Sequence, residues 1–207
     1  MKTIRILLAS FCTLLLLSQQ ATAQKGTLKL NLNYNYSIPV SGFNADLVSK
    51  ASPRGFTGAL MYTFNNKWDG GLAFGFQDYY QKYQRATYPL GKTQDISAVI
   101  SNSIQTTPVL VKVTYAPFNT PSIRPYLSAG AGANLIDFKQ YLGEFGSDKA
   151  SVGIIAQCGL GVTLPFGKLK TSGIDVGANY SYAPYKKNGY QDLNAVNLHA
   201  GIYFQIK

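Results

Sequence analysis

Charged side chains are scarce in this 207-residue sequence. Asp, Glu, Lys and Arg together make up 14% of the residues, whereas typical soluble domains carry about 25%. Glu144 is the only glutamate and His199 the only histidine. A chain so poor in ionisable groups does not have the composition of an ordinary soluble domain.

Cysteine is equally sparse, since the sequence contains only Cys12 and Cys158. We expect Cys12 to be removed with a signal peptide, so that Cys158 stands alone and no intramolecular disulfide can form. The cysteines and the histidine also lack the spacing of a zinc site. The sequence therefore predicts neither a metal nor a cofactor.

The N-terminus has the three parts of a secretory signal peptide. Lys2 and Arg5 form a positive region, and residues 6–17 are almost wholly apolar. That apolar run is shorter than the roughly 20 residues of a membrane-spanning helix. We therefore expect export, with residues 1–23 as the signal peptide and residues 24–207 as a single mature domain.

No apolar run of 18 residues follows the signal segment, so we expect no membrane-spanning helix there. Instead, apolar and polar residues alternate. Successive strand side chains point to opposite faces, so each alternating segment is predicted to be a strand with one apolar and one polar face. The pattern occurs in eight segments: 27–36, 56–64, 68–76, 109–115, 127–135, 152–164, 174–182 and 196–206.

These eight segments predict an all-β fold, an eight-stranded antiparallel transmembrane barrel with an up-and-down meander. The first and last segments match in pattern, as expected if they pair to close the barrel. Short and long predicted connections alternate, which is typical of short periplasmic turns and long extracellular loops. The short ones are 65–67, 117–123 and 165–171, and the long ones are 37–55, 82–108, 139–150 and 184–195.

Alternation alone does not say which face is inside, so a soluble lipocalin-like periplasmic barrel is the alternative. The polar face consists mostly of Asn, Gln, Ser, Thr, Ala and Gly, whereas a water-facing surface carries more charges. Aromatic residues near segment ends, such as Tyr62, Trp68 and Tyr180, fit interfacial girdles. We therefore expect the apolar face to meet the lipid of a Gram-negative outer membrane.

Two motifs carry a family resemblance: residues 124–132, Arg-Pro-Tyr-Leu-Ser-Ala-Gly-Ala-Gly, and residues 202–207, Ile-Tyr-Phe-Gln-Ile-Lys. With them, residues 26–207 resemble the small outer-membrane β-barrel family of the OmpA transmembrane domain, OmpX-type barrels and porin-family β-barrel domains. The resemblance implies an integral outer-membrane barrel. These motifs are architectural and imply no catalytic residue.

Few charges fall on the predicted inner face. Lys29, Lys112 and Asp175 lie there near the periplasmic end, and Lys29 and Asp175 could meet beside Tyr203. His199 lies mid-strand on the same face. Because a buried charge must be paired or hydrated, we expect these five side chains to form a polar cluster that fills the lumen.

Glycines recur on the same inner face, most clearly in the similar segments 128–135 and 157–164. They could leave space for a ligand or a water path. They could instead relieve crowding beside large inward groups such as Tyr126 and Tyr203, because small barrels fill their interiors with side chains. We favour the second interpretation.

Catalysis is not expected. His199 has no serine at a spacing that suggests a nucleophile and its base, and Glu144 lies in a predicted outer loop. The precursor has a net charge of +10, and part of this charge lies in predicted outer loops. These residues would contact lipopolysaccharide phosphates or form an ordinary solvated surface: Lys50, Arg54, Lys82, Arg85, Lys92, Lys186 and Lys187.

Three function classes follow. We expect a monomeric barrel with a structural or interaction role, in contact with outer-membrane lipid, lipopolysaccharide and other envelope proteins, and without nucleic acid. The first alternative is a narrow porin-like channel or small-ligand binder. The second is an accessory barrel of a secretion or envelope-assembly system, similar in size to PorT-like proteins.

Overall fold

The computed structural model describes residues 26–89, 95–118, 122–142, 145–167, 170–185 and 192–206, so the expected signal peptide lies outside the described residues. None of the helices in these ranges is long and apolar enough to span a membrane. The elements are β1 (Leu28–Pro39), α2 (Gly42–Asp46), β2 (Ser52–Thr63), β3 (Trp68–Lys82), β4 (Ala86–Pro89), β5 (Asp95–Ala98), β6 (Ile100–Tyr115), β7 (Arg124–Leu142), β8 (Phe145–Phe166), β9 (Ser172–Tyr182) and β10 (Ala195–Ile206).

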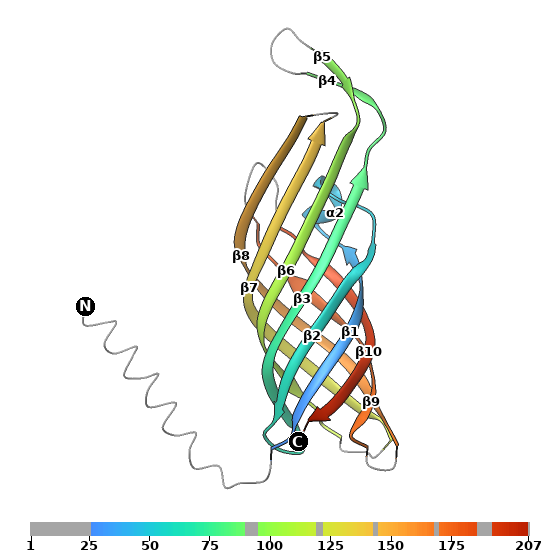
Figure 1. Ribbon diagram of the computed structural model, residues 1–207, viewed down its shortest axis with the longest axis vertical. Helices are drawn as coiled ribbons and strands as arrows, with labels where there is room; N and C mark the ends of the chain where they lie inside the picture. Colours follow the sequence, from blue (N-terminus) through green and yellow to red (C-terminus); the bar gives the residue numbers. More distant parts are fainter. Residues whose placement is uncertain are drawn as a thin grey trace, which may run out of the picture.

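Eight of the strands form one closed antiparallel barrel in the order β1-β10-β9-β8-β7-β6-β3-β2 (Figure 1). The barrel closes between β1 and β10, where Leu28 pairs with Ile206 and Pro39 with Ala195. The predicted eight-stranded meander and its closure are therefore confirmed. We call the end with the start of β1, the end of β10 and the β2–β3 turn the turn end, and the opposite end the extended end.

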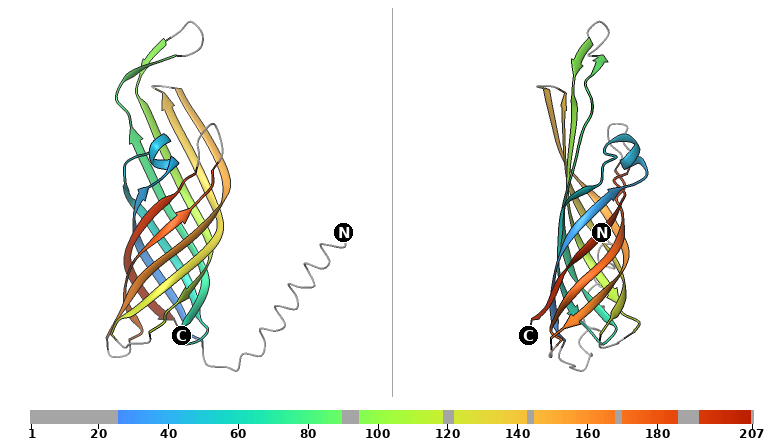
Figure 2. Two further views of the ribbon diagram at one scale, coloured as in Figure 1. Left: turned by 180° about the vertical axis from the view of Figure 1, so that it is seen from behind. Right: turned by 90° about the vertical axis from the view of Figure 1, so that its right-hand side faces the viewer.

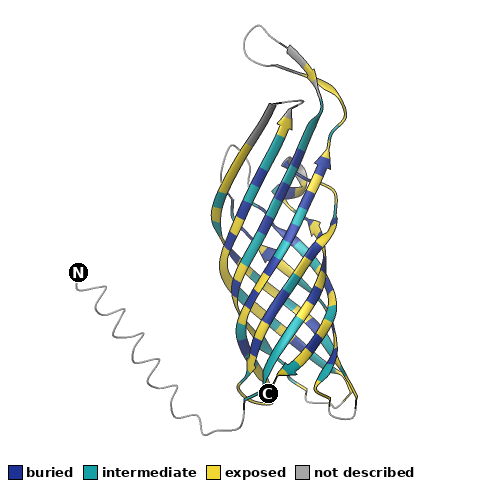
Figure 3. Ribbon diagram, viewed as in Figure 1, coloured by how far each residue is buried: buried dark blue, intermediate teal, exposed yellow. Residues whose placement is uncertain are grey.

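The apolar face of each strand points outward. Along β1, Leu32 and Tyr34 are 44% and 55% exposed, whereas Asn33 and Asn35 between them are each 8% exposed. Figure 3 shows the same alternation of exposed and buried positions around the barrel. An apolar exterior around a polar lumen is the reverse of a lipocalin-like barrel, and it suits a barrel surrounded by lipid.

Four neighbouring strands, β3, β6, β7 and β8, continue beyond the others and form a one-sided wall at the extended end (Figure 2). The predicted loop 139–150 was therefore wrong, because β7 and β8 pair from Leu142↔Phe145 onward. The predicted loop 82–108 also contains structure, namely the β4–β5 hairpin and the first half of β6. Alternation missed the extension of β6 because its outward positions in the wall are polar, as at Gln105 and Thr107.

The barrel mouth at the extended end is covered by α2, which the sequence pattern did not predict. Phe43 and Val48 are fully buried, and Leu47 is 1% exposed. The Phe43 ring meets the Tyr79 ring edge-on with centroids 4.7 Å apart. These side chains belong to one apolar cluster with Ile104 and other residues on the inner face of the wall. The wall therefore has an apolar core that α2 shields from water.

Replacing Phe43 with alanine should lower the free energy of unfolding by about 3–5 kcal/mol, because it removes a fully buried ring from that cluster. Urea unfolding in lipid vesicles, followed by the fluorescence of Trp68, measures the loss. Phe118→Ala is the matched control, since Phe118 is 64% exposed beyond β6. Equal losses in the two variants would show that α2 does not pack as described.

Candidate functional site

A buried polar cluster crosses the middle of the lumen, and the strand register explains its first contact. Asn33 of β1 pairs with Gly201 of β10, which pairs with Asp175 of β9. Because Gly201 has no side chain, the Asn33 amide Nδ2 can reach past it and donate to Asp175 Oδ2 at 3.0 Å. Asp175 is only 2% exposed, so this carboxylate depends on such donors.

The second contact also depends on glycines that leave space for larger side chains, and here there are two of them. The register runs from Tyr126 of β7 through Gly161 and Gly177 to His199 of β10. A methyl group on Gly161 would collide with the Tyr126 ring, and one on Gly177 would collide with the His199 ring. The two glycines therefore clear the space in which the Tyr126 hydroxyl and His199 Nε2 meet at 3.0 Å, as the crowding interpretation predicts for Tyr126.

The donors in this cluster can be assigned. The Tyr126 hydroxyl donates its proton to Asp175 Oδ1 at 2.8 Å, so it can only accept from His199. His199 Nε2 therefore carries a proton, and Nδ1, which is buried and has no partner within the described ranges, is left as the acceptor nitrogen. We call Asn33, Tyr126, Asp175 and His199 the cross-layer, because together they bridge the lumen.

Lys29 does not join the cross-layer. Its Nζ lies 3.0 Å from Asp69 Oδ2 and also donates to Oδ1 at 3.2 Å. The expected meeting of Lys29 with Asp175 was therefore wrong. The register explains why: Asp175 is level with Asn33, four residues along β1 from Lys29.

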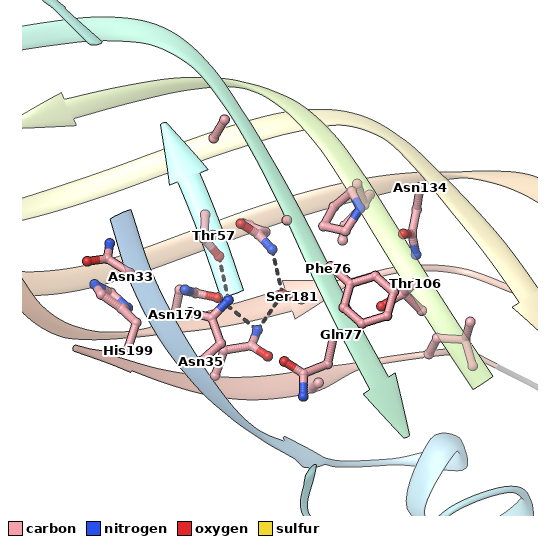
Figure 4. A pocket seen from close by; sticks show the side chains of 18 of the residues that line it. Asn33, Asn35, Thr57, Phe76, Gln77, Thr106, Asn134, Asn179, Ser181 and His199 are labelled. Atoms are coloured by element: carbon pink, nitrogen blue, oxygen red, sulfur yellow. Dashed lines mark hydrogen bonds between the residues drawn. The ribbon is translucent and has the colours of Figure 1, made fainter. Parts of the chain in front are cut away.

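Above the cross-layer, toward the extended end, lies a polar chamber of about 60 Å³ (Figure 4). Asn197 donates to Asn179 at 2.9 Å and to Ser181 at 2.8 Å, and Gln157 donates to Ser181 at 2.9 Å. Asn35 donates to Thr57. Amides and hydroxyls that bond to one another leave room for only a few water molecules.

A second chamber, of about 50 Å³, lies on the turn-end side of the cross-layer, and we call it the lower chamber. Tyr203, a member of the predicted cluster, lines it, and so do Lys29 and Arg124. Lys112 lines both chambers. The predicted residues are thus divided. Asp175 and His199 belong to the cross-layer, with 3.9 Å between Asp175 Oδ2 and His199 Nε2, Lys29 and Tyr203 line the lower chamber, and Lys112 lies between the two chambers.

The sequence predicted which face of each strand points into the lumen, but not which side chains meet there. Asn33 and Asp69 were not predicted members of the lumen cluster, although both stand at inward positions of alternating segments. Only the register between strands brings them to Asp175 and Lys29. No group of three or more His, Cys, Asp or Glu in the described part of the chain could hold a metal ion.

The basic side chains predicted in outer loops lie beyond the apolar band wherever they are described. Arg54 pairs with Asp78 at 3.2 Å and lies 5.8 Å from the centre of the Tyr80 ring. Contact of these residues with lipopolysaccharide phosphates stays a prediction. Lys50, Arg54, Lys82 and Arg85 are exposed, whereas Lys92, Lys186 and Lys187 lie outside the described residues.

A match to a known family agrees with the architecture. A family profile described as the outer membrane protein beta-barrel domain matches residues 9–204. No curated protein matches the chain. Solved structures of similar shape include the N-terminal β-barrel domain of Pseudomonas aeruginosa OprF, with 14% identity, a TM-score of 0.47 and coverage of 88% of this chain and 100% of that one.

Two further solved structures have comparable scores. Ail, the attachment invasion locus protein of Yersinia pestis, is 13% identical with a TM-score of 0.47, and the alignment covers 87% of this chain and 97% of Ail. Neisserial surface protein A is 18% identical with a TM-score of 0.46, at the same two coverages.

Proposed function

Since the chain belongs to the outer membrane protein β-barrel domain family, we propose that it is a closed outer-membrane barrel that acts through its external surface. Its location is the bacterial outer membrane. The single observation that carries the proposal is the double closure of the lumen, by the cross-layer at mid-height and by α2 at the extended end.

The sizes of the chambers support a closed lumen. Each chamber holds about 50–60 Å³, enough for a few water molecules and far below the 300–1,000 Å³ of typical ligand pockets. A solute would have to displace Tyr126 and Asp175, whose hydrogen bond joins β7 to β9. These features favour a structural or interaction role over the narrow channel.

The wall supports the second half of the proposal. Tyr80 of β3 and Tyr141 of β7 are 45% and 46% exposed on its outer face. Lys139 and Asp137 form an ion pair of 3.2 Å beside them. Paired strands hold these side chains in place at little further entropic cost, which suits a surface that binds another envelope protein or a neighbouring cell.

Purified protein in planar lipid bilayers should show no stable unitary conductance, because the cross-layer interrupts the water path. The double change Phe43→Ala with Tyr126→Ala is the positive control, since it removes a side chain from each of the two closures and should give measurable steps. Reproducible conductance steps from the wild-type protein would overturn the closed barrel in favour of the channel. Loss of secreted proteins from a deletion strain would instead favour the accessory barrel of a secretion system.

A further inference from the structure

The lower chamber contains a lysine without a matching carboxylate. Asp69 uses both of its oxygens on Lys29, and Asp175 accepts from Asn33 and Tyr126. Lys112 forms no hydrogen bond or ion pair with any residue that the structure describes. Its ammonium group therefore lies in a confined space with unused donors.

A second cation stands at the mouth of the same chamber. Arg124 opens β7, and its Nη2 donates to the carbonyl of Asn66 in the β2–β3 turn at 3.3 Å. Arg124 has no carboxylate within 4.0 Å in the described part of the chain. Lys29, Lys112 and Arg124 thus oppose one lining carboxylate, Asp69, which leaves the chamber with an excess of positive charge.

The chamber also contains neutral polar groups without partners. Tyr203 lines it, and its hydroxyl makes no hydrogen bond to a described residue. The side-chain oxygen of Asn31 is buried and likewise lacks a partner there, and as an acceptor it calls for a donor such as a water molecule. Buried polar groups are normally satisfied, so the Lys112 ammonium and the Tyr203 hydroxyl call for an acceptor.

Size and charge together define that acceptor. The chamber of about 50 Å³ holds a few waters or one tetrahedral oxyanion, and it is too small for a sugar or a nucleotide. We infer that the lower chamber binds one small oxyanion of the phosphate or sulfate class, held by Lys112 and Arg124 with the Tyr203 hydroxyl. Cationic donors bind such oxygens more strongly than neutral donors do.

The cross-layer separates this site from the extended end. Tyr126 lines the chamber on the side of the extended end, where its hydroxyl is bonded to Asp175. Arg124 and Lys29 stand near the first residues of their strands, at the turn end. The anion therefore enters and leaves at the turn end, and its binding requires no passage through the barrel.

Calorimetric titration of the full protein in non-ionic detergent with inorganic phosphate at low ionic strength tests the inference. We expect saturable binding at one site, with sulfate competing. Lys112→Met should weaken the affinity tenfold or more, because a hydrogen bond to a charged group is lost. Lys139→Met is the matched control, since it removes a lysine of the outer face and should leave the affinity unchanged.

Tyr203→Phe keeps the test decisive if Lys112→Met does not fold. It removes only the hydroxyl and should weaken phosphate binding several-fold. Absence of saturable binding to the wild-type protein, or equal affinities of wild type and Lys112→Met, would overturn the inference. Neither result depends on conductance, so the anion site and the closed barrel can fail separately.

Discussion

Replacing Asp175 with alanine is expected to lower the free energy of unfolding by about 3–5 kcal/mol, since removing one member of a buried charged network leaves the others unpaired. The Asn33 amide and the Tyr126 hydroxyl would each lose an acceptor. Little water can replace these contacts, because Asp175 is 2% exposed.

Urea unfolding in lipid vesicles measures the effect, with Trp68, the only tryptophan, as the reporter. Asp148→Ala is the matched control, because its side chain is 67% exposed and lies 4.0 Å from Lys139. Surface pairs of this kind contribute little, so its transition should stay almost in place. If Asp175→Ala unfolds at the control's midpoint, the cross-layer does not hold the barrel together.

Gly201→Ala should destabilise the barrel by about 3 kcal/mol, at the upper end for overpacking a tightly packed site. Its added methyl carbon would lie 2.0 Å from the Leu32 carbonyl oxygen and 2.2 Å from Asn33 Oδ1. The first atom belongs to the backbone of the paired strand, so β1 and β10 would have to move apart. The Asn33–Asp175 hydrogen bond crosses the same position and would also be lost.

Gly153→Ala makes the same chemical change where there is room. The nearest atom to its new methyl carbon would be Ile136 Cδ1 at 3.5 Å, which is an ordinary contact. We expect Gly153→Ala to leave the urea midpoint almost unchanged. Equal midpoints for the two alanine variants would show that the close approach of β1 and β10 is not as described.

The barrel itself could be predicted from the sequence because its exterior is apolar and its lumen polar. Leu32, Tyr34 and Tyr36 alternate with asparagines, and the two environments leave a period of two in the chain. Low charge then settled which face lay outside, and both inferences agree with the structure. The strand number depends on this one contrast, whereas export was inferred from residues 1–23 and the family from the motifs at 124–132 and 202–207.

The contrast between an apolar outer face and a polar inner face ends where the wall extends beyond the lipid. Alternation therefore could not predict the strands there. Gln105 and Thr107 face outward on a part of β6 whose outward side chains are polar, so no alternation marked them as strand. α2 was missed because its buried residues serve an irregular cap with no period to detect. The lumen contacts were missed for another reason. The pairing of Lys29 with Asp69 depends on strand register, which alternation leaves undetermined.

The glycines that face the lumen also help to determine the register between β1 and β10. A slip of one residue between β1 and β10 would turn apolar side chains inward, and the hydrophobic effect opposes it. A slip of two keeps every face correct, so apolar burial cannot reject it. It would, however, set Asn33 opposite His199 or Tyr203 in place of Gly201, with no room for either ring. Steric exclusion inside the lumen thus rejects the two-residue slip between β1 and β10, which the burial of apolar side chains does not reject.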